Sequence, residues 1–354
     1  LELSWTCTGA EAKWPGRCDH AMVVVGTKEK SILMMGGVAR GRWALQDVWC
    51  SVNCISWSCS TSNAPWSARS GHAAVALGNT VLLVGGVGRS GLSGDVWKCK
   101  DGIGAHWTCE SDAGEWPARY GHCLLDVDEA LFLLTGVGLG RFLNDVWRSD
   151  DQGVTWRCVT LAAPFAARAA AAAVAVKGRI VLAGGRGEDG CFSDLWISED
   201  GAIWSELTSV DAPKAHSGAS LISLSGTLLL LGGFDGEDHD NTMWEGHMQN
   251  NTVTWTKSAA PWLPRYCHQV VMVDPGVLLL TGGHGARGDF KDAWTSPSFT
   301  MLRSLAMKLS LLGRAVSKRY GVSKEVWENS ILPHLIPSVA MKLIALPERI
   351  DTKI

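Results

Sequence analysis

The sequence contains few residues of several kinds, and each shortage excludes a class of protein. Its 354 residues include only 3 tyrosines and 7 phenylalanines, and lysine plus arginine (32) almost balance aspartate plus glutamate (35). This balance argues against a polybasic nucleic-acid binder, and 46% hydrophobic residues argue against a disordered chain. No apolar run reaches the roughly 18–20 residues of a membrane helix, so we expect no transmembrane segment. The composition is that of a globular protein with one large or two smaller domains.

Cysteine spacing indicates neither a metal site nor a disulfide framework. The 11 cysteines are odd in number, so they cannot all pair within the chain. No C-x-x-C motif occurs, and the nearest pair, Cys50 and Cys54, has the wrong spacing for one. We therefore expect no metal and no cofactor, and the redox compartment stays open. The chain starts at Leu1 without a methionine or a leader, so any targeting segment is expected to have been removed; the localisation stays unknown.

Tryptophan (18) and glycine (40) are abundant, and both recur at a fixed spacing. Six glycine pairs, one of them with threonine in its first position, follow each other at intervals of 48–50 residues. An Asp-x-Trp run follows each pair, with Thr242 replacing the aspartate in the fifth copy, and another tryptophan comes after most of these runs. Such self-similarity indicates a repeat protein. The pairs are Gly36-Gly37, Gly85-Gly86, Thr135-Gly136, Gly184-Gly185, Gly232-Gly233 and Gly282-Gly283.

Each repeat has the pattern of four strands. Alanine- and valine-rich runs such as 73–77 lead through a polar turn into continuous apolar runs such as 81–84, which suit strands buried on both faces. The glycine pair permits a sharp turn, the Asp-x-Trp run forms a third strand, and the later tryptophan lies on a fourth. Because one four-stranded antiparallel sheet cannot bury both faces, the repeats are expected to stack radially.

These motifs resemble the kelch repeat family. The matching residues are the double glycines, the Asp-x-Trp runs and an Arg-x-Gly-His motif at 69–72 and 119–122, with weaker copies beginning at Arg17 and Arg265. The resemblance covers about residues 1–296 and implies an all-β fold, a six-bladed β-propeller. Residues 1–297 are accordingly assigned to the propeller and residues 298–354 to a C-terminal extension.

The N-terminal strand is predicted to close the ring. The sixth repeat has Trp294 but no tryptophan on a fourth strand, whereas Trp5 stands twelve residues before Arg17, the interval that also separates Trp57 from Arg69. Trp5 is thus expected on the missing strand, which removes a free sheet edge. Sixteen of the 18 tryptophans fall at repeat positions, where packing between blades is their expected role.

One turn matches the Asp-box pattern S-x-D-x-G-x-x-W of sialidase-like propellers. It runs from Ser149 to Trp156, and residues 198–204 form a shorter copy. We expect the aspartate to accept backbone amide hydrogen bonds, the glycine to take a positive φ and the tryptophan to pack beneath. The motif is structural even in enzymes, so it carries no catalytic assignment.

Enzymatic alternatives lack their characteristic residues. Sialidase chemistry, as the resemblance would imply, needs an arginine triad and a tyrosine nucleophile, but the arginines and two of the three tyrosines are repeat features. Ligand patterns of the kelch-type copper oxidase and of iron-dependent specifier proteins are not found. The arginines are expected to pair with blade aspartates or to line one mouth of the channel, and the repeat histidines to be structural. These residues are Arg17, Arg69, Arg119, Arg168, Arg265, His20, His72, His122 and His268.

The connections after the glycine pairs differ between repeats, so function is expected there. The fifth connection is the strongest charge cluster; it could bind a hard cation, but a solvated acidic turn is the favoured interpretation. Mixed charges on one face favour a protein-contacting surface. The candidate partner-binding residues are Arg40, Arg42, Arg141, Asp235, Glu237, Asp238, Asp240, His284 and Arg287.

The composition changes after Pro297. Residues 298–354 carry nine basic and four acidic side chains, or +5, which leaves −8 for the propeller. Apolar residues at helical spacing predict a basic amphipathic helical tail that folds back on the propeller, docks on a partner or touches a membrane surface peripherally. Its candidate contact residues are Leu305, Leu309 and Trp327.

The sequence therefore predicts a non-enzymatic interaction or scaffold module, a subunit of a larger assembly that docks through propeller loops and tail. Its expected partners are other protein subunits and not nucleic acid. The alternative is a carbohydrate-binding or sialic-acid-processing propeller, sialidase-like or epimerase-like, for which no catalytic residue is assigned.

Overall fold

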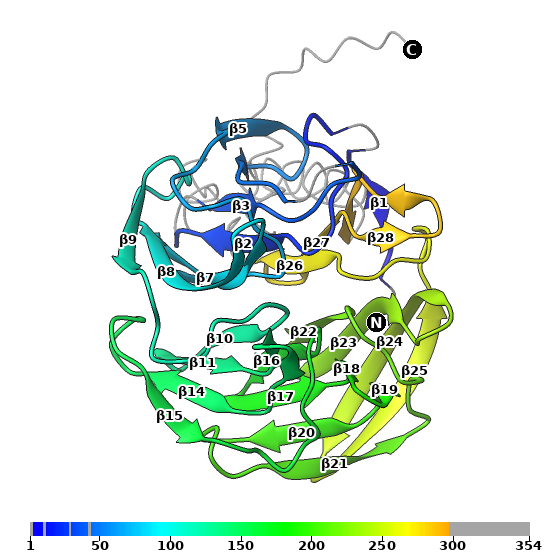
Figure 1. Cartoon of the computed structure of the whole chain (residues 1–354). Coiled ribbons are helices and arrows are strands. Elements are labelled where there is room, and N and C mark those ends of the chain that lie inside the picture. The colour runs from blue at the N-terminus through cyan, green and yellow to red at the C-terminus, as the bar shows by residue number, and fades with distance from the viewer. Residues whose placement is uncertain (1–2, 10–11, 28–29, 42–43, 297–354) are drawn as a thin grey trace, which may run out of the picture.

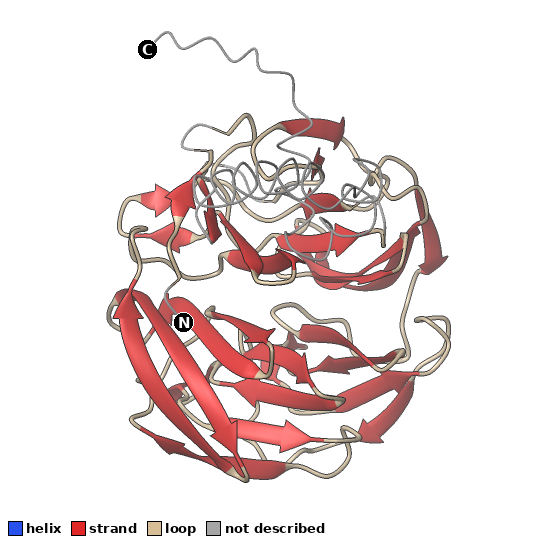
Figure 2. Cartoon of the chain, turned by 180° about the vertical axis from the view of Figure 1, so that it is seen from behind, coloured by secondary structure: helices blue, strands red, loops and turns tan. Residues whose placement is uncertain are grey.

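The computed structural model describes residues 3–9, 12–27, 30–41 and 44–296 as strands joined by loops (Figures 1 and 2). Within these ranges the fold is all-β, and no helix in them has the length and apolar character of a membrane span. The predicted helical tail, with Leu305, Leu309 and Trp327, lies outside the described residues, as does Arg42.

Four repeats form separate four-stranded antiparallel sheets. In each, the first strand of the repeat is the inner strand, and the apolar run beside it is buried on both faces, as the sequence predicts. The sheets are β2 (Ala21–Val25), β3 (Ser31–Met35), β4 (Val48–Ser51) and β5 (Trp57–Thr61); β6 (Ala73–Leu77), β7 (Thr80–Gly88), β8 (Gly91–Cys99) and β9 (Trp107–Ser111); β10 (Cys123–Val127), β11 (Ala130–Leu134), β14 (Val146–Ser149) and β15 (Arg157–Thr160); and β26 (Gln269–Asp274), β27 (Val277–Thr281), β30 (Ala293–Ser296) and β1 (Thr6–Cys7).

The prediction of six separate blades needs correction, because the fourth and fifth repeats share one eight-stranded sheet. The fourth strands of the two repeats, β21 and β25, meet in the middle of this sheet and pair in parallel through Thr208–Val210 and Thr252–Thr254. β24 and β25 are longer than their counterparts elsewhere, so β25 reaches the neighbouring edge strand. The order across this sheet is β16 (Ala172–Val176), β17 (Arg179–Ala183), β20 (Leu195–Ser198), β21 (Ser205–Val210), β25 (Thr252–Ala259), β24 (His239–Gln249), β23 (Thr227–Phe234) and β22 (Ser220–Leu224).

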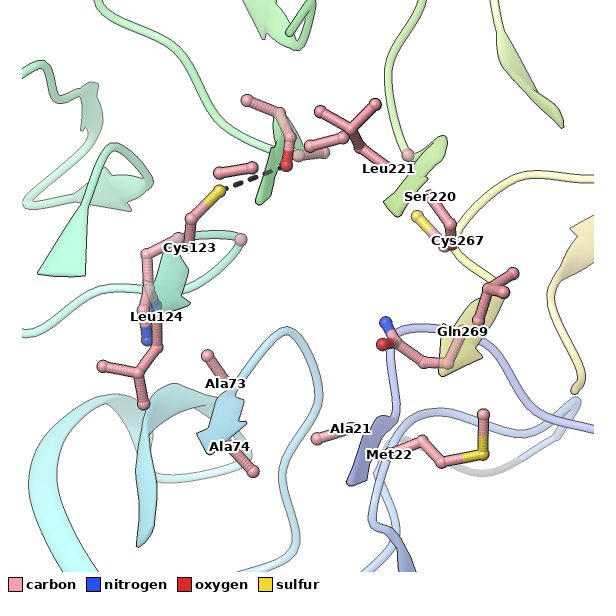
Figure 3. Close-up of a pocket in the computed structure, with 18 of the residues that line it drawn as sticks. Ala21, Met22, Ala73, Ala74, Cys123, Leu124, Ser220, Leu221, Cys267 and Gln269 are labelled. Atoms are coloured by element: carbon pink, nitrogen blue, oxygen red, sulfur yellow. Dashed lines mark hydrogen bonds between the residues drawn. The ribbon is translucent and has the colours of Figure 1, made fainter. Parts of the chain in front are cut away.

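The innermost strands of the six repeats form a closed ring. Each of β2, β6, β10, β16, β22 and β26 lies beside the next, and β26 returns to β2 (Figure 3). In each repeat the amide of one residue donates a backbone hydrogen bond of 2.7–3.1 Å to the equivalent carbonyl of the preceding repeat in the ring, and all six residues have positive φ. This backbone circle consists of Asp19, Gly71, Gly121, Ala170, Gly218 and Cys267.

The N-terminal strand closes the last sheet, as predicted. β1 pairs antiparallel with β30, and Thr8 N–H donates to the carbonyl of Ala293 at 2.8 Å. The Trp5 ring packs edge-on against Trp262 with centroids 4.5 Å apart, and its indole donates to the sulfur of Met243 at 3.0 Å. The first strand of the chain thus completes the sheet formed by the last repeat.

Tryptophan packing fills the space between sheets. Trp14 meets Trp57, Trp66 meets Trp107, and Trp116 meets Trp156, each pair edge-to-face with ring centroids 4.8–6.3 Å apart. Trp14, Trp66 and Trp262 are almost completely buried. The tryptophans therefore stabilise the stack of sheets and do not form an aromatic platform for sugar.

Short hairpins after the glycine pairs line one mouth of the ring (Figure 1). These hairpins belong to the connections after the glycine pairs, whose sequences differ from repeat to repeat. They are β12 (Val137–Gly138) with β13 (Arg141–Phe142), β18 (Arg186–Gly187) with β19 (Gly190–Cys191), and β28 (His284–Gly285) with β29 (Gly288–Asp289).

Candidate functional site

The arginine of the repeat motif makes the same buried ion pair in five repeats. Arg119 donates to both carboxylate oxygens of Asp145 at 2.6 Å and to the carbonyl oxygen of Thr135 at 2.9 Å. The indole of Trp147 donates to the same carboxylate. An arginine held inside its own repeat in this way is structural, and each of the five pairs with a blade aspartate as expected. The pairs are Arg17–Asp47, Arg69–Asp95, Arg119–Asp145, Arg168–Asp194 and Arg265–Asp292.

These ion pairs shift the ionisation of their aspartates. Burial alone would raise the pKa of Asp95, but the hydrogen bonds and positive charge of Arg69 outweigh burial and lower that pKa. The same balance, with Arg168 as the partner, lowers the pKa of Asp194. Both carboxylates are therefore held in the charged form.

The four repeat histidines are buried and neutral. Burial, followed by the charge of the neighbouring repeat arginine, lowers the pKa of His72, His122 and His268 to about 3. Burial and Arg17 also lower the pKa of His20 well below its ordinary value, and its Nε2 lies 3.0 Å from the hydroxyl of Thr281. The prediction that these histidines are structural agrees with this environment.

The fifth repeat departs from the pattern at three positions. Pro213 stands where the other repeats have tryptophan or phenylalanine, His216 replaces the arginine, and Thr242 replaces the aspartate. The Nδ1 of His216 lies 2.9 Å from the carbonyl oxygen of Lys214, the position where the other repeats place an arginine Nε. Because a carbonyl only accepts, Nδ1 carries the proton and Nε2 is an acceptor. That buried Nε2 has no hydrogen-bond partner among the described residues.

A cavity of about 430 Å³ lies at this altered position. Gly232 lines it, and its carbonyl is the counterpart of the carbonyls that accept from arginine elsewhere. Asp240 Oδ1 accepts from the hydroxyl of Thr242 at 2.6 Å. A carboxylate therefore lies beside the position that the repeat aspartate occupies in the other five repeats.

The acidic connection of the fifth repeat forms the rim of this cavity. Asp235, Asp238 and Asp240 line it, whereas Glu237 is exposed and does not. The backbone amides of Asp238 and Glu237 donate to Asp235 and lower its pKa. The structure thus brings three of the four predicted acidic residues to one cavity.

The remaining predicted residues are spread over the same mouth. Arg40, Arg141 and Arg287 are exposed, and Arg40 lies beside the β28–β29 hairpin, near Gly288. His284 is half-buried, and its Nδ1 lies 2.6 Å from Asp289 Oδ1. Arg141 belongs to the third repeat, so the predicted residues form no single cluster.

An aromatic group links the fifth and sixth repeats at this mouth. The rings of Phe234, His239, Tyr266 and His284 have centroid separations of 5.3–6.3 Å. Burial, with Cys267 as the next contribution, raises the pKa of Tyr266 to about 12. Tyr266 is therefore not activated as a nucleophile.

The ring encloses a central cavity of about 370 Å³ (Figure 3). Alanines of β6, of β16 and of the adjoining loops form much of its wall. The thiol of Cys123 donates to the carbonyl of Ala171 at 3.2 Å. Among the described residues, its lining contains no arginine and no tyrosine. This lining does not favour a site for a sugar acid.

The turn between third and fourth strands has the predicted chemistry. The carboxylate of Asp151 accepts from the amides of Val154 and Thr155, Gly153 has φ 84°, and the indole of Trp156 donates to the Gly153 carbonyl. Burial would raise the pKa of Asp151, but these hydrogen bonds lower it to about 2. The turn therefore serves the fold.

Sequence reasoning missed two groups of residues. The first is the combination of His216 with Thr242: the sequence shows Thr242 in place of the repeat aspartate, and His216 at the matching arginine position could have been found in the same way. Cys18 and Asp289 gave no such signal, because they are far apart in the sequence and meet only when the ring closes. Burial, followed by Asp19 and Asp289, raises the pKa of the Cys18 thiol, and burial with Asp19 raises that of Cys267.

The family model described as the KLHDC2/KLHL20/DRC7 Kelch-repeats domain matches residues 105–283. No curated protein matches the chain. The matched region includes the fifth repeat and its cavity.

Proposed function

Because the chain belongs to the KLHDC2/KLHL20/DRC7 Kelch-repeat domain family, we propose that it is a protein-interaction propeller whose partner places an arginine side chain in the cavity of the fifth repeat. The observation that carries this proposal is the substitution of the Arg–Asp ion pair by His216 and Thr242 at the position of that cavity.

The hydrogen-bonding groups around the cavity favour a guanidinium. Two groups that line the cavity, the Gly232 carbonyl and the carboxylate of Asp240, can accept hydrogen bonds, whereas Nε2 of His216 packs against Gly184 of the fourth repeat. Burial lowers the pKa of His216, so its ring is neutral and does not repel a cation. A guanidinium has five donors in a planar fork and no acceptor, and it matches such a set better than an ammonium.

The charge at the rim also supports a basic side chain. Three carboxylates line the cavity, against two lysines. Lys214 lies 3.6 Å from Asp235, and the Nζ of Lys257 lies 5.9 Å from the centre of the Trp244 ring. The described propeller and its acidic loop would thus attract a basic segment of a partner.

Two further parts of the proposal concern the number of blades and the assembly. We count the two halves of the eight-stranded sheet as separate blades, which gives six blades in all; the closed ring of six inner strands supports this count. The scaffold role, subunit docking and a second contact through residues 298–354 remain predictions. Arg40, Arg141 and Arg287 would add contacts at the rim of the same mouth.

A peptide array tests the proposal. The purified chain would be applied to immobilised random peptides, and each binding peptide would be resynthesised with its arginine replaced by lysine or by citrulline. We expect the binding affinity to fall at least tenfold with either replacement. Lysine keeps the positive charge but lacks the planar fork of donors, and citrulline lacks the charge. Peptides that bind equally well after both replacements would overturn the proposal.

Variants within the loop provide the matched control. Asp240→Asn removes a carboxylate that lines the cavity, and Glu237→Gln removes one that belongs to the same loop but does not line it. The first should weaken binding of the selected peptide at least tenfold and the second less than twofold. Equal effects of the two variants would contradict a role for the cavity.

A further inference from the structure

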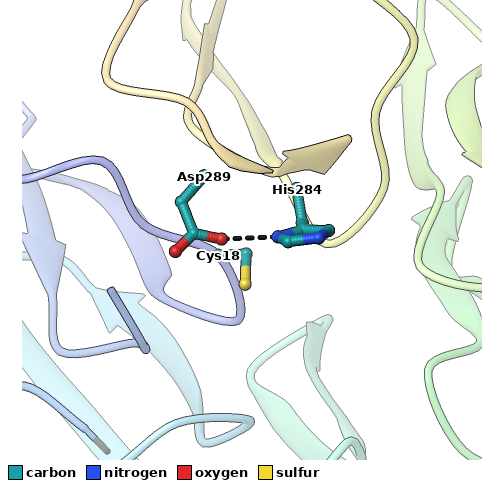
Figure 4. A group of neighbouring side chains, drawn as sticks. All are labelled: Cys18, His284 and Asp289. Carbon is teal, nitrogen blue, oxygen red and sulfur yellow. Dashed lines mark hydrogen bonds and ion pairs between the residues drawn. The ribbon is translucent and has the colours of Figure 1, made fainter. Parts of the chain in front are cut away.

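A second cluster lies where the first and last repeats meet, at the same mouth (Figure 4). Cys18 comes from the segment before β2, and His284 and Asp289 come from the β28–β29 hairpin. One donor atom from each of the three side chains lies within 4.8 Å of the other two. The cluster therefore spans the seam of the ring.

Backbone pairing fixes the three residues in place. Cys18 exchanges two hydrogen bonds with Val38, and His284 exchanges two with Tyr266, all at 2.9–3.0 Å. Across the seam, the amide of Arg17 donates to the carbonyl of Phe290 at 3.0 Å. The backbone of Cys18 and that of His284 are thus held by regular pairing on the two sides of the seam.

Two of the three donor side chains are buried, and the third is partly exposed. Cys18 is 7% exposed and the Asp289 side chain 8%, whereas the His284 side chain is 39% exposed. His284 Nδ1 already lies 2.6 Å from Asp289 Oδ1. A cation can approach beside the partly exposed His284 and reach Cys18 and Asp289, which are almost inaccessible to solvent.

The backbone circle gives an independent indication that this seam is special. At four of its six positions the residue is glycine or alanine, which offers no donor side chain. The two exceptions, Asp19 and Cys267, both lie at the seam, and their side chains hydrogen-bond to each other. Both adopt positive φ, 51° and 53°, as the other four positions of the circle also do, so their side chains and not their backbone distinguish the seam.

We propose that Cys18, His284 and Asp289 bind a zinc ion that joins the first repeat to the last. A thiolate, an imidazole and a carboxylate together suit zinc, whereas calcium and magnesium take oxygen ligands. Binding replaces the thiol proton of Cys18, which passes to solvent. Tetrahedral zinc bonds of about 2.0–2.3 Å place two ligands roughly 3.3–3.8 Å apart, so His284 Nδ1 and Asp289 Oδ1, now 2.6 Å apart, would separate to admit the ion.

Cobalt substitution tests the site directly. The full chain would be reduced, freed of metal with a chelator and titrated with Co²⁺. We expect one equivalent per chain to produce thiolate-to-cobalt absorption in the near ultraviolet and tetrahedral bands in the visible, and Zn²⁺ to displace both. A titration without a thiolate band would overturn the proposal.

Serine substitutions identify the ligand. Cys18→Ser should remove the thiolate band and weaken zinc at least 100-fold, while Cys59→Ser, an exposed cysteine of β5, should change neither. His284→Gln should weaken zinc at least tenfold. A thiolate band that survives Cys18→Ser would overturn the assignment.

A stability measurement distinguishes loss of the site from loss of the fold. Zinc should raise the melting temperature of the natural chain, because a ligand that binds only the folded state stabilises it. The melting temperature of Cys18→Ser in chelator should match that of the natural chain in chelator and should not respond to zinc. An equal response to zinc in both proteins would contradict binding at the seam.

Discussion

At the scale of single residues, the repeated ion pairs and histidines hold each sheet together. Asp145 and Arg119 are both buried, and the guanidinium of Arg119 donates two hydrogen bonds of 2.6 Å to the carboxylate of Asp145. Removing one member of a buried pair leaves the other charge without compensation. Exposed pairs, such as Arg148 with Asp150, lie in water and contribute far less.

Asp145→Asn should therefore lower the free energy of unfolding by about 3–5 kcal/mol. Asp150→Asn, which breaks the exposed pair, should lower it by less than about 1 kcal/mol. Urea unfolding measures both through the shift in midpoint at constant slope. Similar midpoints for the two variants would show that the buried pair is not a principal support of its sheet.

Acid should destabilise the fold through the buried histidines. His72, His122 and His268 have pKa values of about 3 in the folded chain against 6.5 for the free side chain. The unfolded chain therefore binds more protons between these values, and the free energy of unfolding falls as the pH falls from about 6.5 towards 3. Each histidine contributes a slope of about 1.4 kcal/mol per pH unit, and none contributes above pH 7.

The check is urea unfolding from pH 7.5 to pH 5, compared between the natural chain and His122→Gln. The free energy of unfolding should fall with acid less steeply in the variant than in the natural chain, by about 1.4 kcal/mol per pH unit. A free energy of unfolding that stays constant down to pH 5 in the natural chain would contradict the buried, neutral state of these histidines.

At the scale of the elements, the strands and turns follow from the sequence, because alternation, apolar runs and glycine pairs are local signals. The closing strand β1 is also predictable, because the interval from Trp5 to Arg17 repeats elsewhere. The shared sheet of the fourth and fifth repeats is not. Its β21–β25 pairing joins edge strands in parallel, and no local pattern reports which edges meet.

Loss of the closing contacts should open the last sheet. Trp5→Ala removes the ring contact with Trp262 and the hydrogen bond to Met243, and should lower the free energy of unfolding by about 3 kcal/mol. Leu161→Ala, at an 81% exposed position, is the control and should change it by less than about 0.5 kcal/mol. Thermal melting compares them, and equal melting temperatures would argue against closure by β1.

At the scale of the whole molecule, both proposed sites lie at places where the six repeats differ. The repeat itself could be predicted from the sequence, and so could the acidic loop of the fifth connection. The cavity depends on His216 and Thr242, whose significance appears only against five intact ion pairs. The cluster of Cys18 with His284 and Asp289 depends on ring closure, which brings the two ends of the repeat array together.

The most direct measurement of the central claim is calorimetric titration of an array-selected arginine peptide into the natural chain and into the double variant His216→Arg with Thr242→Asp. The double variant restores the ion pair of the other five repeats, so it should fill the cavity and keep or raise the melting temperature. We expect its affinity for the peptide to fall at least 100-fold. Unchanged affinity in a folded double variant would contradict binding in the fifth-repeat cavity.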